Sequence, residues 1–366
     1  MKLLIIKLFV LFIKVLYAFM KLRKTENKIV WLSRQSNQKS EDMKMLSEEI
    51  SKVSPDTKQV FRLCRLKDES GISVSYLFFI LRDMWEISSA KIAITDTYSI
   101  PVSCLNHKEC LKVFQIWHAL GAVKKFSLQS AGKAQGRDLG VAKAMHMHKN
   151  YDFVVAPSKK TAEFYCEAFG CTEDKIVIAS LPRVDVILDG KSRYDEFIEL
   201  NPQYKNKKLV TYLPTFRDGD SRYIENLYKT FLDDDEFALV VSPHPATQTN
   251  DIYKFNGKFS IYDLAKLSYG IVTDYSATSL ECSLLNKPLW FYVPDYEKYK
   301  EEQGLNIDIK EEMSSVSFND EKELLASVKS GDYNFDNLKR FSDKYIENKG
   351  SDNTGKLADI ICNQLG

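Results

Sequence analysis

The sequence predicts an α/β protein with two Rossmann-like domains that face each other across a cleft. Short apolar runs of strand character alternate with amphipathic runs of helical character along most of the chain. Such alternation is typical of parallel sheets covered by helices on both faces. It forms two series, separated by the polar stretch 189–207, and the length of 366 residues suits two domains of ordinary size.

The first series occupies residues 25–188 and predicts the N-terminal domain. Its apolar runs are short and bounded by polar residues, as expected for buried strands. The predicted strands are Lys28–Leu32, Gln59–Leu63, Lys91–Thr95, Val113–Trp117, Asp152–Ala156 and Ile176–Leu181. The amphipathic runs Glu41–Val53 and Val74–Ser88 predict helices between them.

The second series occupies residues 208–366 and predicts the C-terminal domain. We expect the last helix of this series to be able to pack back on the N-terminal domain. The predicted strands are Leu209–Leu213, Phe237–Ser242, Lys258–Ile261, Gly270–Thr273 and Leu289–Val293. The predicted helices lie near Tyr223–Leu232, Ile261–Lys266 and Ser279–Leu285.

Residues 1–24 predict a helix that lies in the membrane interface. Leu3–Met20 is apolar except for Lys7 and Lys14, and with Lys21 these lysines recur every seven residues, which aligns them on one stripe of a helix. A lysine near the centre of a spanning helix is costly, whereas an interfacial helix turns it toward anionic headgroups. Two alternatives remain: a signal or spanning segment, and a helix packed on the protein itself.

The composition excludes several classes of function. Lys and Arg number 51 against 50 for Asp and Glu, so the net charge of +1 provides no general attraction to nucleic acid, and no nucleic-acid partner is expected. Any site for a polyanion must therefore be local. The seven cysteines include no C-x-x-C pair, which argues against a structural zinc site and a disulfide scaffold and favours a reducing, cytoplasmic environment.

A histidine follows the fourth predicted strand. In Gln115–Gly121, His118 comes directly after an apolar run, and a histidine with a pKa near neutrality at such a strand end suits a general base. The alternative is a core histidine beside Trp117. From residue 121 to 149 there are six Lys or Arg against one acid, which predicts a local basic surface or, alternatively, an ordinary solvated face. The basic residues are Lys124, Lys125, Lys133, Arg137, Lys143 and Lys149.

Two further clusters follow strands of the second series. In Leu213–Asp218, Arg217 offers a planar guanidinium fork for a phosphate or a carboxylate. In Ser242–Pro245, His244 lies between two prolines, which stiffen the backbone around it. The alternatives are an Arg–Asp pair in a surface turn and an exposed histidine without a ligand.

The most informative cluster is Gly270–Glu281. The spacing of Thr278 and Glu281 is that of a capping box, which predicts a helix N-terminus near Thr278. The N–H groups of such a terminus, together with the hydroxyls of Ser276, Thr278 and Ser279, would form a seat for an anion. An ordinary capped helix is the alternative.

Together these clusters resemble the successive motifs of the CDP-glycerol glycerophosphotransferase family, whose members build teichoic acids and related capsular polymers. The matching segments are Trp117-His118, Leu181–Asp185, Pro214–Asp218, His244-Pro245, Thr273–Ser276, Lys287–Tyr292 and Asp295–Tyr299. The resemblance runs from about Gln115 to Tyr299. The sequence departs from the family pattern at Ala119, where a glycine is frequent, and at Glu301–Met313, which lacks the usual Gly/Pro-rich pattern.

The resemblance implies a GT-B architecture with an N-terminal acceptor domain, a C-terminal donor domain and peripheral attachment to the cytoplasmic face of the membrane. The implied partners are a CDP-glycerol or CDP-ribitol donor, an undecaprenyl-diphosphate-linked saccharide acceptor and an anionic membrane surface. His118 and His244 would be catalytic: His118 would deprotonate the acceptor hydroxyl, and His244 would act on the donor pyrophosphate. Asp274 would either position the polyol or brace its loop. The other implied donor-binding residues are Thr215, Arg217, Asp218, Ser276, Thr278 and Ser279, and the implied acceptor or basic surface comprises Lys124, Lys125 and Arg183.

The implied reaction is a displacement at the polyol-bearing phosphorus, with CMP as the leaving group. Such phosphoryl transfer depends on positioning and charge neutralisation, which a helix terminus, Arg217 and His244 would provide. We therefore expect neither a cofactor nor an obligatory metal. The competing hypotheses are a CDP-ribitol enzyme, a nucleotide-sugar glycosyltransferase of the same fold, and a non-catalytic scaffold in a wall-polymer complex.

Overall fold

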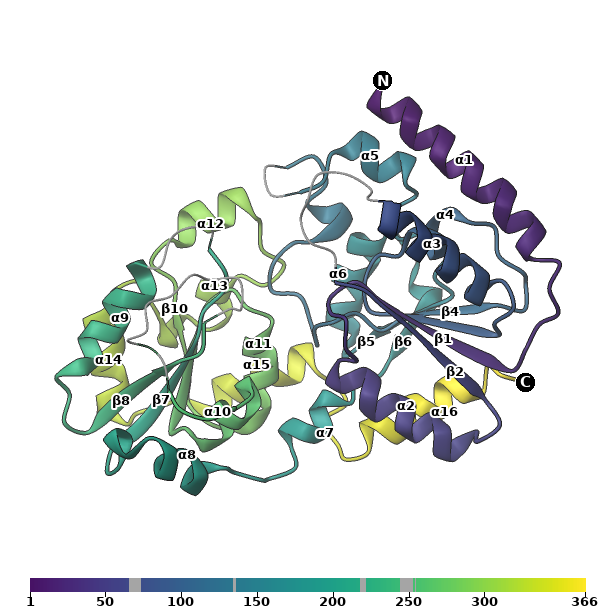
Figure 1. The fold of residues 1–366 in the computed structure, drawn as a ribbon. Helices are drawn as coiled ribbons and strands as arrows, with labels where there is room; N and C mark the ends of the chain where they lie inside the picture. Colours follow the sequence, from purple (N-terminus) through teal and green to yellow (C-terminus); the bar gives the residue numbers. More distant parts are fainter. Residues whose placement is uncertain (66–73, 134–135, 218–221, 244–252, 254) are drawn as a thin grey trace. The chain divides into compact units, whose positions relative to one another are not determined.

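The chain, seen here as a computed structural model, divides into two compact units. The structure describes residues 1–65, 74–133, 136–217, 222–243, 253 and 255–366. The first unit consists of Met1–Leu120, Lys125–Asp185 and Glu347–Gly366, and the second of Gly121–Lys124 and Val186–Ile346. Each unit contains one parallel sheet (Figure 1). The predicted α/β class with two parallel sheets is therefore confirmed.

The first unit contains a six-stranded sheet in the order β2-β1-β3-β4-β5-β6, in which neighbouring strands are parallel. Every residue of β1 is buried, as expected for a strand covered on both faces. The strands are β1 (Lys28–Ser33), β2 (Lys58–Leu63), β3 (Ile92–Thr95), β4 (Lys112–Gln115), β5 (Phe153–Ala156) and β6 (Ile176–Ile178). All six overlap the predicted strands.

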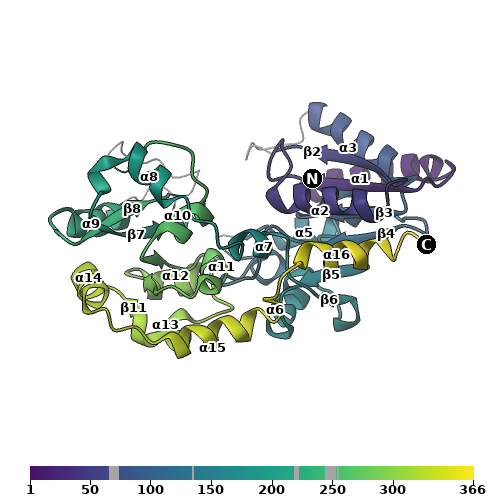
Figure 2. The ribbon, with the colours of Figure 1, turned by 90° about the horizontal axis from the view of Figure 1, so that it is seen from below.

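Two helices of the first unit begin at serines that cap them. Ser40 accepts a hydrogen bond from the Met43 N–H at the start of α2, and Ser158 accepts one from Thr161 at the start of α6. Helix α16 packs against α2 in both views (Figures 1 and 2). The helices are α1 (Lys2–Met20), α2 (Glu41–Val53), α3 (Val74–Ile87), α4 (Ile100–Cys104), α5 (Leu139–Ala144), α6 (Lys159–Phe169) and α16 (Asn353–Cys362), and α7 (Arg183–Ile187) lies where the chain passes into the second unit.

Helix α1 packs on the first unit through one stripe and exposes much of its other apolar surface. Val10, Ile13 and Tyr17 are buried, and the Tyr17 hydroxyl lies 2.9 Å from Nδ1 of His107. By length and composition alone, α1 is able to cross a membrane. The exposed apolar side chains of the helix are Leu3, Leu4, Ile5, Leu8, Leu11, Phe12, Val15 and Phe19. Of the three sequence hypotheses, packing on the protein is observed, and it leaves a second apolar face exposed.

The second unit contains a five-stranded sheet in the order β11-β10-β9-β7-β8, again with parallel neighbours. The strands are β7 (Lys208–Leu213), β8 (Phe237–Val241), β9 (Gly270–Thr273), β10 (Leu289–Tyr292) and β11 (Ser317–Phe318). The helices are α8 (Tyr194–Leu200), α9 (Arg222–Leu232), α10 (Ile261–Leu267), α11 (Thr278–Cys282), α12 (Tyr296–Glu302), α13 (Ile309–Glu312), α14 (Glu321–Ser330) and α15 (Phe335–Tyr345). Because β7, β9 and β10 are neighbours and parallel, the residues that follow them meet at one edge of the sheet.

Two sequence predictions differ from the structure in the second unit. Lys258–Ile261 is not a strand, because Ser260 and Asp263 form a capping box that begins α10 at Ile261. The signal was present in the sequence as a serine three residues before an acid. The predicted linker 189–207 contains helix α8, and the second unit already begins at Val186.

Candidate functional site

An arginine and two aspartates meet at the carboxyl edge of the second sheet. Arg217 follows β7, Asp274 follows β9 and Asp295 follows β10. Nε of Arg217 donates to Oδ2 of Asp295 at 2.8 Å, and Nη2 donates to Oδ1 of the same carboxylate at 3.1 Å. Nη1 of Arg217 donates to Oδ2 of Asp274 at 2.7 Å. The guanidinium fork that the sequence predicted for a phosphate is therefore bound by two carboxylates.

This ion network is largely withdrawn from water. The Asp274 side chain is 0% exposed, and the side chains of Arg217 and Asp295 are each 10% exposed. Burial alone would lower the pKa of Arg217, but the charge of Asp274 and the hydrogen bond to Asp295 raise it above its ordinary value. Removing one member would leave a buried charge without compensation, so the network fixes the geometry of this edge.

Asp274 holds the loop that follows β7. Both of its carboxylate oxygens accept a hydrogen bond from the Thr215 N–H, each at 3.0 Å. Of the two roles that the sequence left open for Asp274, the hydrogen bonds show the bracing one. The Thr215 hydroxyl is buried and has no hydrogen-bond partner among the described residues. Because a buried hydroxyl without a partner is costly, this group is suited to bind a ligand.

The turn after β9 lacks the predicted capping box. Helix α11 begins at Thr278, as expected, but its N-cap is Ala277, and Oγ of Ser276 accepts a hydrogen bond from the Thr278 N–H at 3.3 Å. Glu281 is buried and accepts a hydrogen bond from a tyrosine of α10 instead. The Ser279 hydroxyl donates to the Ser276 carbonyl oxygen at 2.8 Å and so belongs to the turn itself. Because helix α11 has five residues, the dipole at its N-terminus is weaker than the sequence suggested.

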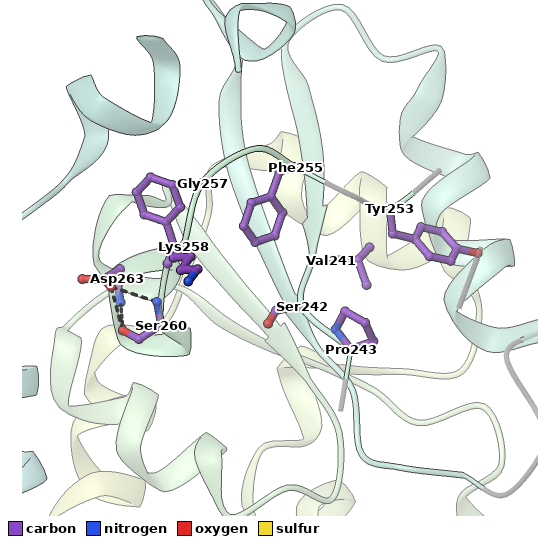
Figure 3. Close-up of a pocket in the computed structure, with 10 residues that line it drawn as sticks. Val241, Ser242, Pro243, Tyr253, Phe255, Gly257, Lys258, Ser260 and Asp263 are labelled. Atoms are coloured by element: carbon purple, nitrogen blue, oxygen red, sulfur yellow. Dashed lines mark hydrogen bonds between the residues drawn. The ribbon is translucent and has the colours of Figure 1, made fainter. Parts of the chain in front are cut away.

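A pocket of about 660 Å³ opens at the carboxyl end of β8, the strand that neighbours β7 (Figure 3). Ser242 and Pro243 line it directly after the strand, and the ring of Phe255 lies across from them. The hydroxyl of Tyr253, another lining residue, is buried and has no partner within the described part of the chain. The lining residues are Val241, Ser242, Pro243, Tyr253, Phe255, Gly257, Lys258, Phe259, Ser260 and Asp263. Aromatic rings with a few polar groups are typical of a small-molecule site.

Lys124 belongs to the second unit, although the sequence predicted it on the basic surface of the N-terminal domain. Its short loop pairs with the segment after α12 through a bridge between Lys124 and Leu305. Burial lowers the pKa of the Lys124 ammonium, the charge of Asp274 raises it, and the charge of Arg217 lowers it further. The ammonium therefore adds positive charge beside the Arg217–Asp274 pair. Lys125, the next residue, belongs to the first unit.

His118 lies at the carboxyl edge of the first sheet. It follows β4, and its Nδ1 lies 2.9 Å from the carbonyl oxygen of Asp96, which follows β3. A carbonyl oxygen accepts hydrogen bonds but cannot donate them, so Nδ1 carries the proton and Nε2 is the basic nitrogen. Burial lowers the pKa of His118 to about 4, against the opposing effect of this hydrogen bond. The imidazole is therefore neutral at pH 7, rather than titrating near neutrality as the sequence predicted.

The backbone and ring contacts around Trp117 fix the position of His118. Trp117 has a φ of 53°, a left-handed conformation that is rare for a bulky residue. Its N–H donates to Oε1 of Gln115 at 2.8 Å, and its ring centroid lies 4.0 Å from that of His118. Phe126 and Phe169 also pack against the indole. Strained backbone held by several contacts is frequent at functional sites, which favours the general base over a core histidine.

Comparisons with known proteins now identify the family. The family model described as CDP-Glycerol:Poly(glycerophosphate) glycerophosphotransferase matches residues 15–363. The chain belongs to this family. The family resemblance read from the sequence motifs is thereby confirmed, as is the prediction of a polyol-phosphate transferase enzyme.

Two relatives and one solved structure give the scale of the similarity. The chain is 27% identical over 359 residues to the teichoic acid ribitol-phosphate primase of Bacillus spizizenii, covering 93% of this chain and 92% of the relative. It is 25% identical over 301 residues to the teichoic acid glycerol-phosphate primase of Bacillus subtilis, covering 78% and 77%. A variant of the wall teichoic acid polymerase TagF soaked with CDPG has a TM-score of 0.68 at 18% identity, covering 100% of this chain and 98% of that one. At this identity the structural likeness shows the fold.

The motif Leu181–Asp185 of this glycerophosphotransferase-family chain braces the first unit. The Arg183 N–H donates to Oδ1 of the buried Asp42 at 2.8 Å, and Nε donates to Oδ2 at 2.8 Å. Asp185 accepts hydrogen bonds from the first N–H groups of α16, including that of Thr354 at 2.8 Å. Arg183, which the sequence predicted on the acceptor surface, is instead committed to an ion pair with α2.

Asp96, whose backbone carbonyl oxygen contacts His118, also has a buried carboxyl group that was not predicted from the sequence. The Asp96 side chain is 3% exposed, its Oδ2 accepts a hydrogen bond from the Ser33 hydroxyl at 3.0 Å, and its Oδ1 has no partner among the described residues. Burial raises the pKa of Asp96 to about 7. Arg34, directly after β1, likewise has a buried Nε without a partner in the described ranges. The sequence did contain a signal for Asp96 and Arg34, because both directly follow apolar strands, where ligands bind in such folds.

Two predicted site residues cannot be placed. His244 and Asp218 lie outside the described residues, so their assignments stay predictions from the sequence. Within the described ranges, no group of three or more His, Cys, Asp or Glu side chains is arranged to hold a metal ion.

Proposed function

We propose that this chain transfers glycerol phosphate from CDP-glycerol to a hydroxyl of a membrane lipid-linked acceptor and releases CMP. The family and its curated relatives support a CDP-polyol phosphotransferase. The observation that carries the proposal is the state of His118, a neutral imidazole with Nδ1 hydrogen-bonded to the Asp96 carbonyl oxygen and Nε2 left as a base. A neutral imidazole of this kind can accept the proton of an attacking hydroxyl.

His118 accounts for the proton transfer in the reaction. Its Nε2 takes the proton of the acceptor hydroxyl as the hydroxyl oxygen attacks the polyol-bearing phosphorus. The new P–O bond forms while the bond from this phosphorus to the CMP oxygen breaks, and CMP leaves with the electron pair. Positioned positive charge and hydrogen-bond donors stabilise the spreading negative charge, which is the main requirement of phosphoryl transfer.

The second unit is assigned to the donor diphosphate. Lys124 contributes a positive charge beside Arg217, whose own charge is balanced by its two aspartates. The unpartnered Thr215 hydroxyl contributes a hydrogen bond, and Ser276 with Thr278 presents hydroxyls at the neighbouring strand end. In this proposal Arg217 and Asp274 act mainly by holding the loop that carries Thr215.

The pocket of Figure 3 is assigned to the cytidine of the donor. Its aromatic rings offer stacking surface for a base, and the unpartnered Tyr253 hydroxyl offers a hydrogen bond. His244 follows the lining residue Pro243 in the sequence, which supports its assignment to the adjacent pyrophosphate. The acceptor is assigned to the first unit, which carries His118, in keeping with the GT-B-like organisation expected from the sequence.

The exposed apolar face of α1 supports peripheral attachment to a membrane, and the cytoplasmic side is the one that the family resemblance implies. Deleting residues 1–24 would also strip buried side chains from the first unit, so substitution of the outer face is the sharper test. Replacing Leu8, Phe12 and Val15 with Ser should weaken binding to anionic vesicles by at least about a hundredfold, because each buried apolar side chain contributes about 1.5–3 kcal/mol. Val53→Ser, at an exposed position of α2, is the matched control. Unchanged vesicle binding of the triple variant would contradict the attachment.

Ribitol phosphate is the second candidate for the transferred group. The relative that covers 93% of this chain is named for ribitol phosphate, whereas the family description names glycerophosphate. Both polyols are joined to cytidine through the same diphosphate, so the assignments of His118 and Thr215 hold for either donor.

The test is a transfer assay with CDP-glycerol and CDP-ribitol in separate reactions, each with a lipid-linked disaccharide. Release of CMP and a product heavier by glycerol phosphate supports the proposal. Transfer from CDP-ribitol alone supports the second candidate. Turnover of a UDP-sugar with release of UDP, and none of either CDP-polyol, would overturn both in favour of a glycosyltransferase.

A further inference from the structure

A groove of about 470 Å³ runs between α1 and α5 in the first unit. The two helices lie side by side in Figure 1 and are in contact. Gly140 permits their close approach, because a Cβ at this position would lie 3.3 Å from a methyl group of Leu3. The groove is lined by Leu3, Lys7, Val10, Leu11 and Lys14 of α1, by Gly140, Lys143 and Ala144 of α5, and by His146. Its floor is therefore apolar and its polar groups are basic.

The basic groups of the groove lack acidic partners. Within the described part of the chain, Lys7, Lys14 and Lys143 form no ion pair with a carboxylate. Burial lowers the pKa of His146, and the charges of Lys14 and Lys149 lower it further. An anion in the groove would relieve this repulsion. Three ammonium groups match a doubly charged diphosphate better than the single charge of a common anionic phospholipid.

The groove lies at the border of the surface assigned to the membrane. Lys7 and Lys14 lie on α1 between its packed stripe, which includes Tyr17, and its exposed apolar face, which includes Leu8 and Phe12. A lipid headgroup at the interface would therefore meet the lysines, and the first part of its chain would meet Leu3 and Leu11 of the groove. A free water-soluble anion would gain nothing from this apolar floor.

The chain that leaves the groove packs near the proposed base. Two residues after His146, the ring of His148 lies 6.3 Å from that of Trp117 between centroids. The Trp117 ring in turn lies 4.0 Å from the ring of His118. A lipid seated in the groove would therefore bind the same unit that carries the base.

We propose that this groove binds the diphosphate and the first isoprenoid units of the lipid that carries the acceptor. The inference rests on the proposed function, which supplies a lipid-linked acceptor. It adds a binding site formed by Lys7, Lys14 and Lys143 over an apolar floor, apart from the donor residues of the second unit.

Farnesyl diphosphate, a soluble isoprenoid diphosphate, is the probe for this site. Calorimetry should show binding to the full chain, and Lys143→Gln should weaken it by about ten- to a hundredfold, the effect of losing one hydrogen bond to a charged group. Gly140→Val, which places methyl groups against Leu3, should weaken it by a similar factor without removing charge. Lys44→Gln, at an exposed position of α2, is the matched control and should bind as the parent does.

Three outcomes would overturn the inference. The first is equal affinity of the parent and a folded Lys143→Gln variant for farnesyl diphosphate. The second is equal affinity of the parent for inorganic diphosphate, which would show an anion site without a lipid. The third is a loss of phosphatidylglycerol vesicle binding in Lys143→Gln with no change toward the probe, which would assign the groove to bulk lipid.

Steady-state kinetics distinguish a failure of this inference from a failure of the proposed function. Lys143→Gln should raise the KM for the lipid-linked acceptor by about tenfold and leave the KM for CDP-glycerol unchanged. If the parent transfers polyol phosphate and Lys143→Gln has the parent's acceptor KM, the groove inference fails alone. If the parent transfers nothing from a CDP-polyol, the proposed function fails, whatever the calorimetry shows.

Discussion

The sites at the strand ends of the two units differ in the partners of their ionisable side chains. In the second unit, Arg217 is bound by both Asp274 and Asp295, and the three side chains are almost fully buried. In the first unit, His118 is hydrogen-bonded to a backbone carbonyl oxygen, and Oδ1 of the nearby Asp96 has no partner among the described residues.

Burial acts differently on the ionisable groups of the two sites. Paired buried charges fix geometry, because separating them leaves an uncompensated charge. A buried imidazole without a charged partner loses its proton instead, as the lowered pKa of His118 shows. In the proposed function, the second unit therefore positions the charged donor, and the neutral His118 of the first unit is free to accept a proton.

Loss of the base should give the largest effect on turnover. His118→Ala should lower kcat by about 10²–10⁴-fold, the usual contribution of a positioned general base. Added imidazole should restore part of the rate, whereas added acetate should not. A steady-state assay of CMP release measures both. A rate within a few-fold of the parent, in a folded variant, would contradict the assignment of His118.

Breaking the ion network should give the largest effect on stability. Arg217→Met should reduce the free energy of unfolding by about 3–5 kcal/mol, because it leaves Asp274 buried without its cation. Lys300→Met removes the cation of an ion pair whose lysine is 48% exposed and should cost less than about 1 kcal/mol. Urea unfolding of the two variants checks the contrast, and equal costs would contradict a structural role for the buried network.

The unpartnered hydroxyl of Thr215 provides a smaller and more selective test. Thr215→Val keeps the shape of the side chain and should weaken binding of CDP-glycerol by about tenfold, the effect of one lost hydrogen bond. Because the hydroxyl has no partner among the described residues, Tm should not fall. A fall in Tm with unchanged donor affinity would mean that the hydroxyl serves the fold, and it would remove Thr215 from the donor site.

A fall in pH should act on stability through two buried histidines. Burial lowers the pKa of His118 to about 4 and that of His148 to about 3, below the ordinary value of 6.5. Because the unfolded chain then takes up protons before the folded one does, stability should fall as the pH drops from about 6.5 toward 4. His148→Phe should reduce this loss, measured as the difference in Tm between pH 7 and pH 5. The same Tm difference in variant and parent would contradict the lowered pKa.

The sequence predicted the sheets well because their signals are local. The apolar run Phe237–Ser242 matches β8 to within one residue, and His118 lies three residues after the end of β4. The same local logic failed at Lys258–Ile261, where a short apolar run outweighed the capping signal of Ser260 and Asp263. Local patterns therefore found the strand ends and misread one helix start.

The contacts across the sheets could not be predicted from local patterns. Arg217 and Asp295 are far apart in the sequence, and only the strand order brings them together. Lys124 lies in a stretch rich in lysine but belongs to the second unit, because its loop pairs with Leu305. The pKa of His118 depends on burial, which a single motif does not reveal.

The most direct test of this division of work is a calorimetric titration of CDP-glycerol into His118→Ala, carried out beside its turnover assay. We predict a dissociation constant within about twofold of the parent's together with the loss of turnover, because a base for the acceptor hydroxyl contributes to the transition state and not to donor binding. A donor affinity that falls in parallel with turnover would place His118 in the donor site and contradict the account.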